Sequence, residues 1–184
     1  VTKSSCIFAH VRAATVGGQI SRSNCHPFSW KDLSFMHNGT VYDFEKIKRE
    51  LRKGLVDETY HLIEGGTDSE HIFSLLVQNM MTQKSHSCRG LKESLKKAVK
   101  SLLNCKENAN ITSPSLLNLV VTDGSSLVAS RYASKGAKND SLYYLQSECI
   151  DEVVAENTCS QSREKSILVA SEPLGNSSSW QLIP

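Results

Sequence analysis

The tripeptide His37-Asn38-Gly39 follows an apolar run at residues 33–36 and offers two hydrogen-bond donors. Glycine adopts a positive φ at little cost, and the Asn side-chain amide can point in the same direction as the glycine N–H. Two donors aimed at one point stabilise the charge that develops on a carbonyl oxygen during acyl transfer. The same dipeptide between two strand-like runs is also the commonest hairpin signal. Taken alone, it favours a plain turn.

Two other positions could recognise the head group of an amino acid. A predicted strand at residues 6–12 delivers Arg12 to a loop at residues 13–29, which is rich in Gly, Ser and Asn. The capping-box pattern at residues 67–70 places Asp68 in the first turn of a helix. The planar fork of an arginine binds a carboxylate, and an acid opposite it would hold an ammonium group. Alternatively, Arg12 is a surface cation and Asp68 merely favours the helix N-terminus.

Composition narrows the class of protein and of ligand. A chain of 184 residues with 39% hydrophobic and 22% charged residues predicts one globular domain over residues 1–184. The net charge of +2 gives no electrostatic case for nucleic acid, so we expect a small-molecule ligand. No apolar run is long enough for a membrane span, and the N-terminus carries no signal-peptide pattern. We therefore expect a soluble, cytoplasmic protein.

The six cysteines are scattered without metal-ligand spacing. Their irregular spacing predicts free thiols in a reducing compartment and no metal site. A secreted, disulfide-stabilised domain is the weaker alternative.

Hydrophobic spacing predicts helices in the first half of the chain and strands in the second. The predicted helices begin at Asp43 and Asp68, and a third covers residues 91–103. The predicted strands cover residues 117–122, 127–132, 142–145 and 166–170, and the first two are joined by a hairpin at Asp123-Gly124. A polar loop is expected at residues 156–165. This order argues for an α+β fold with helices packed on a sheet.

Four motifs of the first half occur in an order that resembles the class II glutamine amidotransferases, which are N-terminal-nucleophile hydrolases. The motifs are HVRAAT at residues 10–15, CHPF at 25–28, MHNG at 36–39 and GTDSE at 66–70. In the second half, VTDG at residues 121–124, SRY at 130–132 and LVASEPL at 168–174, followed by Trp180 and Pro184, are similar to the stand-alone branch of the family. That branch is associated with γ-glutamyl amide hydrolysis in glutathione degradation and ergothioneine synthesis.

The resemblance implies a four-layer αββα sandwich and a set of residue roles. An N-terminal cysteine attacks the γ-glutamyl amide carbonyl and forms a thioester. Arg12 holds the substrate α-carboxylate with help from Thr15, and Asp68 holds the α-ammonium group. Asn38 and Gly39 form the oxyanion hole. No cofactor or metal is implied.

Three histidines accompany these motifs. His26 is assigned to the substrate pocket, although a structural role in its loop also accounts for it. His10 and His37 are expected to be core residues or to support the site.

The chain departs from the family pattern at its start, where residue 1 is Val1 and the segment that should carry the nucleophile is missing. Cys6 and Cys25 cannot replace it, because an internal cysteine lacks the free α-amine that serves as the base. We therefore expect an N-terminally incomplete, inactive fragment of a γ-glutamyl amidohydrolase that acts on glutamine or a γ-glutamyl peptide.

The alternative is a non-catalytic γ-glutamyl-binding or scaffold subunit of a peptidase complex. Sequence upstream of Val1 separates the two functions, because a chain that starts Met-Cys favours the enzyme. A peptidase or synthase subunit is the expected protein partner.

Overall fold

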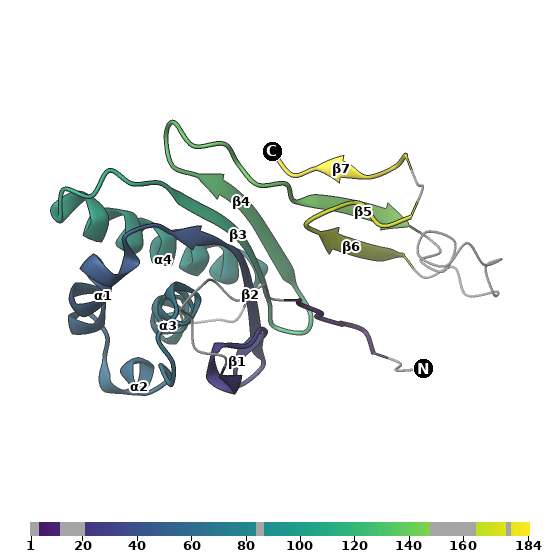
Figure 1. Ribbon diagram of the computed structural model, residues 1–184. Helices are drawn as coiled ribbons and strands as arrows, with labels where there is room; N and C mark the ends of the chain where they lie inside the picture. Colours follow the sequence, from purple (N-terminus) through teal and green to yellow (C-terminus); the bar gives the residue numbers. More distant parts are fainter. Residues whose placement is uncertain (1–3, 12–20, 84–86, 148–164, 176–177) are drawn as a thin grey trace.

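The computed structural model describes residues 4–11, 21–83, 87–147, 165–175 and 178–184. These residues form a four-stranded antiparallel sheet of order β1-β2-β3-β4 and a three-stranded antiparallel sheet of order β6-β5-β7. The helices cover one face of the larger sheet, and the smaller sheet lies on its other side (Figure 1). The helical elements are η1 (Arg22–Asn24), α1 (Phe44–Lys53), α2 (Asp57–Tyr60), α3 (Asp68–Met81) and α4 (Cys88–Asn108). The strands are β1 (Phe28–Trp30), β2 (Leu33–Val41), β3 (Ser115–Thr122), β4 (Leu127–Ala133), β5 (Tyr143–Ser147), β6 (Ser166–Ala170) and β7 (Gln181–Leu182).

Alternation along β2 gives the larger sheet an apolar face and a more polar one. Leu33 and Phe35 are fully buried in the core with the helices, and Val41 is buried with them at the end of the strand. Asn38 and Thr40 have the opposite parity, so their exposed side chains point to the other face. The sheet thus leaves the polar side chains of β2 on the face away from the helices.

Helix α3 is the central helix of the layer, and its N-terminus has a capping box. Thr67 Oγ1 accepts from the Glu70 N–H at 3.3 Å, and Glu70 Oε2 accepts from the Thr67 N–H at 3.2 Å. Phe73 of this helix stacks on Phe35 of β2, with ring centroids 5.6 Å apart. The cap and this packing fix where the helix begins relative to the sheet.

The smaller sheet is tied to the larger one by side chains that donate to backbone carbonyls. Asn118 Nδ2 donates to the carbonyl of Ser141 at 2.8 Å, just before β5. Arg131 Nε donates to the carbonyl of Asp140 at 2.8 Å, and its Nη1 donates to Ile183 after β7 at 3.2 Å. Asn118 and Arg131 are paired across β3 and β4, so one row of the larger sheet carries these contacts.

The N-terminal part of the chain differs from the predicted elements. Residues 4–11 form no strand, so the strand predicted at residues 6–12 is wrong over its described part. Ile7 is 65% and Val11 99% exposed, because the alternation of apolar residues there finds no sheet to pack on. The irregular loop predicted at residues 13–29 is wrong where η1 and β1 form, since Phe28 pairs with Phe35. The short elements α2 and β7 were not predicted.

The predicted α+β class is confirmed, with the helices and two antiparallel sheets forming three layers (Figure 1). A second helical layer, which the αββα sandwich requires, is not formed by the described residues and stays a prediction. Within the described ranges, no helix is long and apolar enough to cross a membrane. The same residues contain no group of three or more His, Cys, Asp or Glu side chains that could hold a metal ion. Four cysteines there are free thiols, namely Cys6, Cys25, Cys88 and Cys105.

Candidate active site

Asn38 and Gly39 lie inside strand β2 and are not a turn. They pair with Asn118 and Leu117 of β3, and the strand continues to Val41. The hairpin interpretation of this dipeptide is therefore wrong, because a two-residue turn cannot lie in the middle of a ladder. The exposed Asn38 side chain lies on the face away from the helices, where its amide can donate to a bound molecule.

Gly39 occupies a position that no other residue can fill without strain. Its φ is 148°, a conformation that L side chains rarely adopt. A Cβ at this position would collide with the carbonyl of Leu116 and lie 3.0 Å from Nε2 of His37. The backbone at Gly39 is thus packed tightly against β3 and against the preceding histidine.

The carboxylate of Asp68 joins the first turn of α3 to the end of β2. Its Oδ2 accepts from the Val41 N–H at 2.8 Å, and its Oδ1 accepts from the Ser69 N–H at 2.8 Å. Oδ1 also accepts from the Ser69 hydroxyl at 3.3 Å. A carboxylate has about four acceptor sites, so these three bonds leave room for a further donor such as an ammonium group. Asp68 is therefore more than a helix-terminal charge, because it is bonded to the strand that carries Asn38 and Gly39.

Glu70 holds the loop that leads to Asp68, a role that the sequence did not reveal beyond its place in the capping box. Its buried carboxylate accepts from the N–H groups of Glu64 at 3.2 Å, Gly65 at 2.7 Å and Thr67 at 3.2 Å. Several backbone donors on one carboxylate make a rigid turn. The position of Asp68 is consequently fixed from the N-terminal side of the helix.

His71 supports the same turn from the helix interior. Its Nδ1 lies 2.7 Å from the carbonyl of Thr67, and its Nε2 accepts from Arg52 Nε at 2.9 Å. Burial of the ring lowers the pKa of His71 from 6.5 to about 4. The ring is therefore neutral near pH 7 and donates through Nδ1–H to Thr67.

Lys106 anchors the C-terminal part of α4 behind the end of β2. Its Nζ donates to the carbonyls of Ser113 at 2.7 Å, Tyr42 at 3.0 Å and Pro114 at 3.1 Å. The side chain is buried, and desolvation lowers the pKa of its ammonium group. Because Tyr42 follows Val41 directly, this cage holds the strand end to which Asp68 is bonded.

His26 belongs to a row of rings that leads from the N-terminal segment into the core. Its ring centroid is 4.3 Å from that of His10 and 4.7 Å from that of Phe28. Phe28 in turn stacks on Phe73 of α3 at 6.2 Å. This packing gives His26 a structural role, and its assignment to the substrate pocket stays a prediction.

Arg12 and Thr15, the predicted binders of the α-carboxylate, lie outside the described residues. The segment before them ends with His10 against His26 and with the exposed Val11. Of the predicted site residues, Asn38 and Gly39 thus lie in β2, and Asp68 is bonded to Val41 at the end of that strand.

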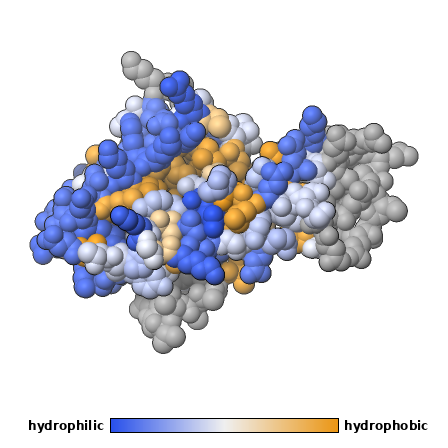
Figure 2. Space-filling view, turned by 90° about the horizontal axis from the view of Figure 1, so that it is seen from above, coloured by the Kyte–Doolittle hydropathy of each residue, from blue (hydrophilic) through white to orange (hydrophobic). Residues whose placement is uncertain are grey.

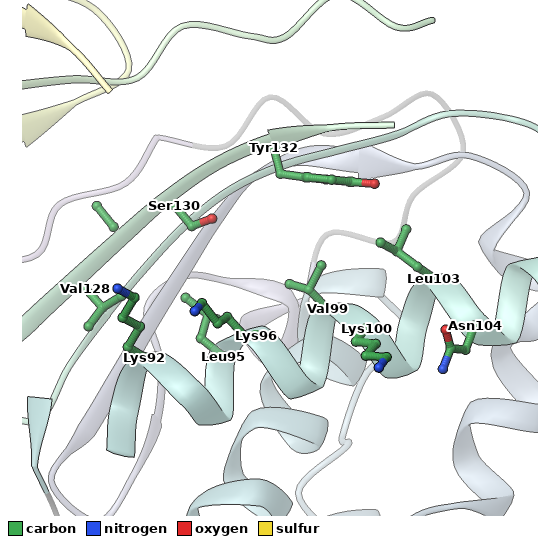
Figure 3. A pocket seen from close by; sticks show the side chains of 11 residues that line it. Lys92, Leu95, Lys96, Val99, Lys100, Leu103, Asn104, Val128, Ser130 and Tyr132 are labelled. Carbon is green, nitrogen blue, oxygen red and sulfur yellow. The ribbon is translucent and has the colours of Figure 1, made fainter. Parts of the chain in front are cut away.

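A groove of about 410 Å³ between α4 and β4 is a separate feature (Figure 3). In Figure 3, Leu95, Val99 and Leu103 of α4 lie across from Val128 and Tyr132 of β4. Figure 2, which views the molecule from above, shows a patch of hydrophobic surface with hydrophilic residues around it. None of the predicted site residues Asn38, Gly39, Asp68 and His26 lines this groove. The groove is therefore separate from the candidate active site.

Comparison with known proteins identifies the family of this chain. Residues 2–184 match the family model of class II glutamine amidotransferases. The chain is 36% identical to the probable glutamine amidotransferase DUG3 of Saccharomyces cerevisiae (strain ATCC 204508 / S288c) over 202 aligned residues, which take in 100% of this chain and 56% of that protein. It is also similar to the solved structure of a glutamine aminotransferase class-II domain protein from Silicibacter pomeroyi, with a TM-score of 0.65 and 29% identity over 89% of this chain and 65% of the other.

The chain therefore belongs to the class II glutamine amidotransferases, and the family prediction is confirmed. It spans only 56% of the length of the yeast relative and 65% of the solved bacterial chain.

Proposed function

We propose that this chain is a single glutamine amidotransferase domain, residues 1–184, of an enzyme that hydrolyses a γ-glutamyl amide. The substrate is glutamine or a γ-glutamyl peptide of the kind met in glutathione degradation. The observation that supports the proposal is the bond between Asp68 and Val41, because it puts a carboxylate at the end of the strand that holds Asn38 and Gly39.

The spacing along β2 suits a glutamyl group. Val41 lies three positions after Asn38, a span of about 10 Å along the strand. The γ-carbonyl and the α-ammonium group of glutamine lie roughly 5 Å apart, and a hydrogen bond of about 2.9 Å at each end brings the total to a similar length. A glutamyl group therefore has the length to run along β2 from Gly39 to the strand end where Asp68 is bonded.

The reaction proceeds in two acyl transfers. The thiolate of an N-terminal cysteine bonds to the γ-carbonyl carbon, and the carbonyl oxygen becomes an oxyanion held by Asn38 Nδ2–H and the Gly39 N–H. The C–N bond then breaks, and the leaving amine takes the proton that the thiol gave up to the α-amine. Water attacks the thioester in the same way and releases glutamate.

The remaining residues bind the rest of the amino-acid head group. Arg12 pairs with the α-carboxylate through its two parallel N–H donors, and Thr15 adds a hydroxyl. His26 contributes to the substrate pocket. The enzyme acts in the cytoplasm, and its protein partner is a peptidase or synthase subunit.

Ligand binding to the 184-residue chain tests the proposal without any chemistry. L-Glutamine should raise the melting temperature, whereas N-acetyl-L-glutamine should not, because acetylation removes the ammonium group that Asp68 binds. The full-length protein with an N-terminal cysteine should then release ammonia from L-glutamine or amine from a γ-glutamyl peptide. Binding without hydrolysis would instead identify the chain as a γ-glutamyl-binding subunit, and equal shifts with both ligands would contradict the proposed site.

A further inference from the structure

His37 is buried between the two halves of the candidate active site. Its Nδ1 lies 2.9 Å from Ser69 Oγ in the first turn of α3, and its Nε2 lies 3.2 Å from the carbonyl oxygen of Leu116 in β3. The ring is 3% exposed. Both ring nitrogens are thus used, one toward a helix and the other toward a strand.

The two partners fix the tautomer of the ring. A carbonyl oxygen can only accept, so Nε2 carries the proton that is donated to Leu116. Nδ1 bonds to the Ser69 hydroxyl, and the same hydroxyl donates to Asp68 Oδ1 at 3.3 Å. These contacts give a chain of hydrogen bonds from Asp68 through Ser69 and His37 to Leu116.

Ser69 and Leu116 each contact another residue of the candidate site. These contacts distinguish His37 from a histidine that only packs in the core. Ser69 donates its backbone N–H to Asp68 Oδ1 at 2.8 Å, so the rotation of this first turn orients the carboxylate. Leu116 supplies the carbonyl oxygen against which Gly39 is packed, and Nε2 of His37 itself borders the space where a Gly39 side chain would lie. One end of this chain of hydrogen bonds therefore reaches the Asp68 carboxylate, and the other reaches the backbone of Gly39 in β2.

We propose that His37 is a positioning residue that holds the Asp68 carboxylate and the Gly39 backbone at a fixed separation. The inference rests on the proposed function, because those two groups bind opposite ends of the γ-glutamyl group. Its ring does not touch the substrate. It acts through Ser69 on substrate affinity and through Leu116 on the geometry of the oxyanion donors, and these two effects can be separated by mutation.

Two substitutions each keep one half of the ring's contacts. The Asn in His37→Asn places its carbonyl oxygen near the former Nδ1 and keeps the bond to Ser69, whereas the Gln in His37→Gln places its amide near the former Nε2 and keeps the bond to Leu116. In the full-length enzyme, His37→Gln should raise KM for L-glutamine by about three- to thirtyfold with kcat nearly unchanged. His37→Asn should lower kcat by a similar factor, about three- to thirtyfold, with KM nearly unchanged.

Ser69→Ala removes the hydroxyl that bonds to both His37 and Asp68, and it leaves the ring in place. It should raise KM as His37→Gln does, and the double variant should be no worse than either single one. Gln78→Ala is the matched control for stability. Gln78 lies farther along α3 and bonds to Val56, Thr59 and Gly54, so its loss should lower the melting temperature without changing KM or kcat.

The kinetic outcomes decide the proposal once the unmodified enzyme is shown to hydrolyse glutamine. Parameters within twofold of the parent in all three site variants, or KM and kcat changes that do not separate between His37→Asn and His37→Gln, would overturn it. An inactive unmodified enzyme would refute the proposed function instead.

A readout that needs no activity is the ring ¹⁵N spectrum of the 184-residue chain. The spectrum should show the Nε2–H tautomer for His37, and the Nδ1–H tautomer would contradict the bond to Leu116.

Discussion

The carboxylate of Asp68 accepts a hydrogen bond from the backbone N–H of Val41 at 2.8 Å, which bonds the first turn of α3 to the last residue of β2. This contact joins residues 27 positions apart in the chain. Strand β2 therefore carries the candidate oxyanion donors Asn38 and Gly39 in its second half, and the Asp68 carboxylate is bonded to its end.

Asp68→Asn should weaken binding of L-glutamine to the 184-residue chain by about ten- to a hundredfold. The substitution keeps an acceptor for the helix but removes the charge that pairs with the α-ammonium group. Isothermal titration calorimetry measures the change. Asp57→Asn is the control, because Asp57 is an exposed acid in the first turn of α2. A comparable loss of affinity in both variants would mean that general charge, rather than the site, accounts for the effect.

Arg12→Lys should raise KM or lower kcat/KM for glutamine by roughly ten- to a thousandfold in the full-length enzyme. A lysine ammonium is a point charge and cannot reproduce two parallel bonds to a carboxylate. Steady-state kinetics provide the test, with Arg49→Lys on the exposed face of α1 as the control. Unchanged kinetics in Arg12→Lys would remove this residue from the site.

Asn38→Ala should lower kcat by roughly 10² to 10³, which corresponds to about 3 to 4 kcal/mol of transition-state stabilisation. KM and the melting temperature should change little, because the side chain is exposed on the open face of β2. Thr40→Ala removes an exposed side chain from the same face of the same strand and should leave kcat unaltered. If kcat of Asn38→Ala stays within about threefold of the parent, the oxyanion assignment is wrong.

Gly39→Ala should destabilise the fold by about 3 kcal/mol or more, because a methyl group meets the Leu116 carbonyl in addition to an unfavourable φ. Gly124→Ala is a matched comparison. It also has a positive φ, of 85°, but nothing lies within 4 Å of the added carbon. Gly124→Ala should lower the free energy of unfolding by only about 1 kcal/mol, through backbone strain alone. Urea unfolding of both variants measures the difference, and equal costs would show that Gly39 is not sterically restricted.

The protein should lose stability as the pH falls from about 6.5 toward 4, in part through His71. Its folded-state pKa is lowered to about 4, so the unfolded chain, with a pKa of 6.5, binds the proton first. The contribution of the neutral ring is complete above pH 6.5 and is lost progressively below it, up to about 3 kcal/mol. Urea unfolding at several pH values should show a shallower dependence in His71→Gln than in the parent. Parallel curves would exclude His71 as a source of the dependence.

Local signals predicted the elements better than they predicted the site. The capping box at Thr67 and Glu70 and the hairpin between β3 and β4 depend on neighbouring residues, and both form as predicted. The strand predicted at residues 6–12 failed because alternation alone does not supply a partner strand.

The long-range contacts of the site lie beyond such local patterns. The bond from Asp68 to Val41 and those of His37 to Ser69 and Leu116 join positions 27, 32 and 79 residues apart. No periodicity or spacing in the sequence encodes those pairs. Residue patterns pointed to Asn38, Gly39 and Asp68 and the family resemblance gave their expected roles, whereas the contacts around them required the structure.

The carbonyl cage around Lys106 also makes this residue an internal reporter for chemical footprinting. Its ammonium group is buried and bonded to three carbonyls, so an amine-reactive label cannot reach it in the folded protein. Exposed lysines such as Lys92 and Lys97 on the same helix react at once. Mass spectrometry of labelled Lys106 would therefore count the molecules in which the end of α4 has separated from β2 and β3.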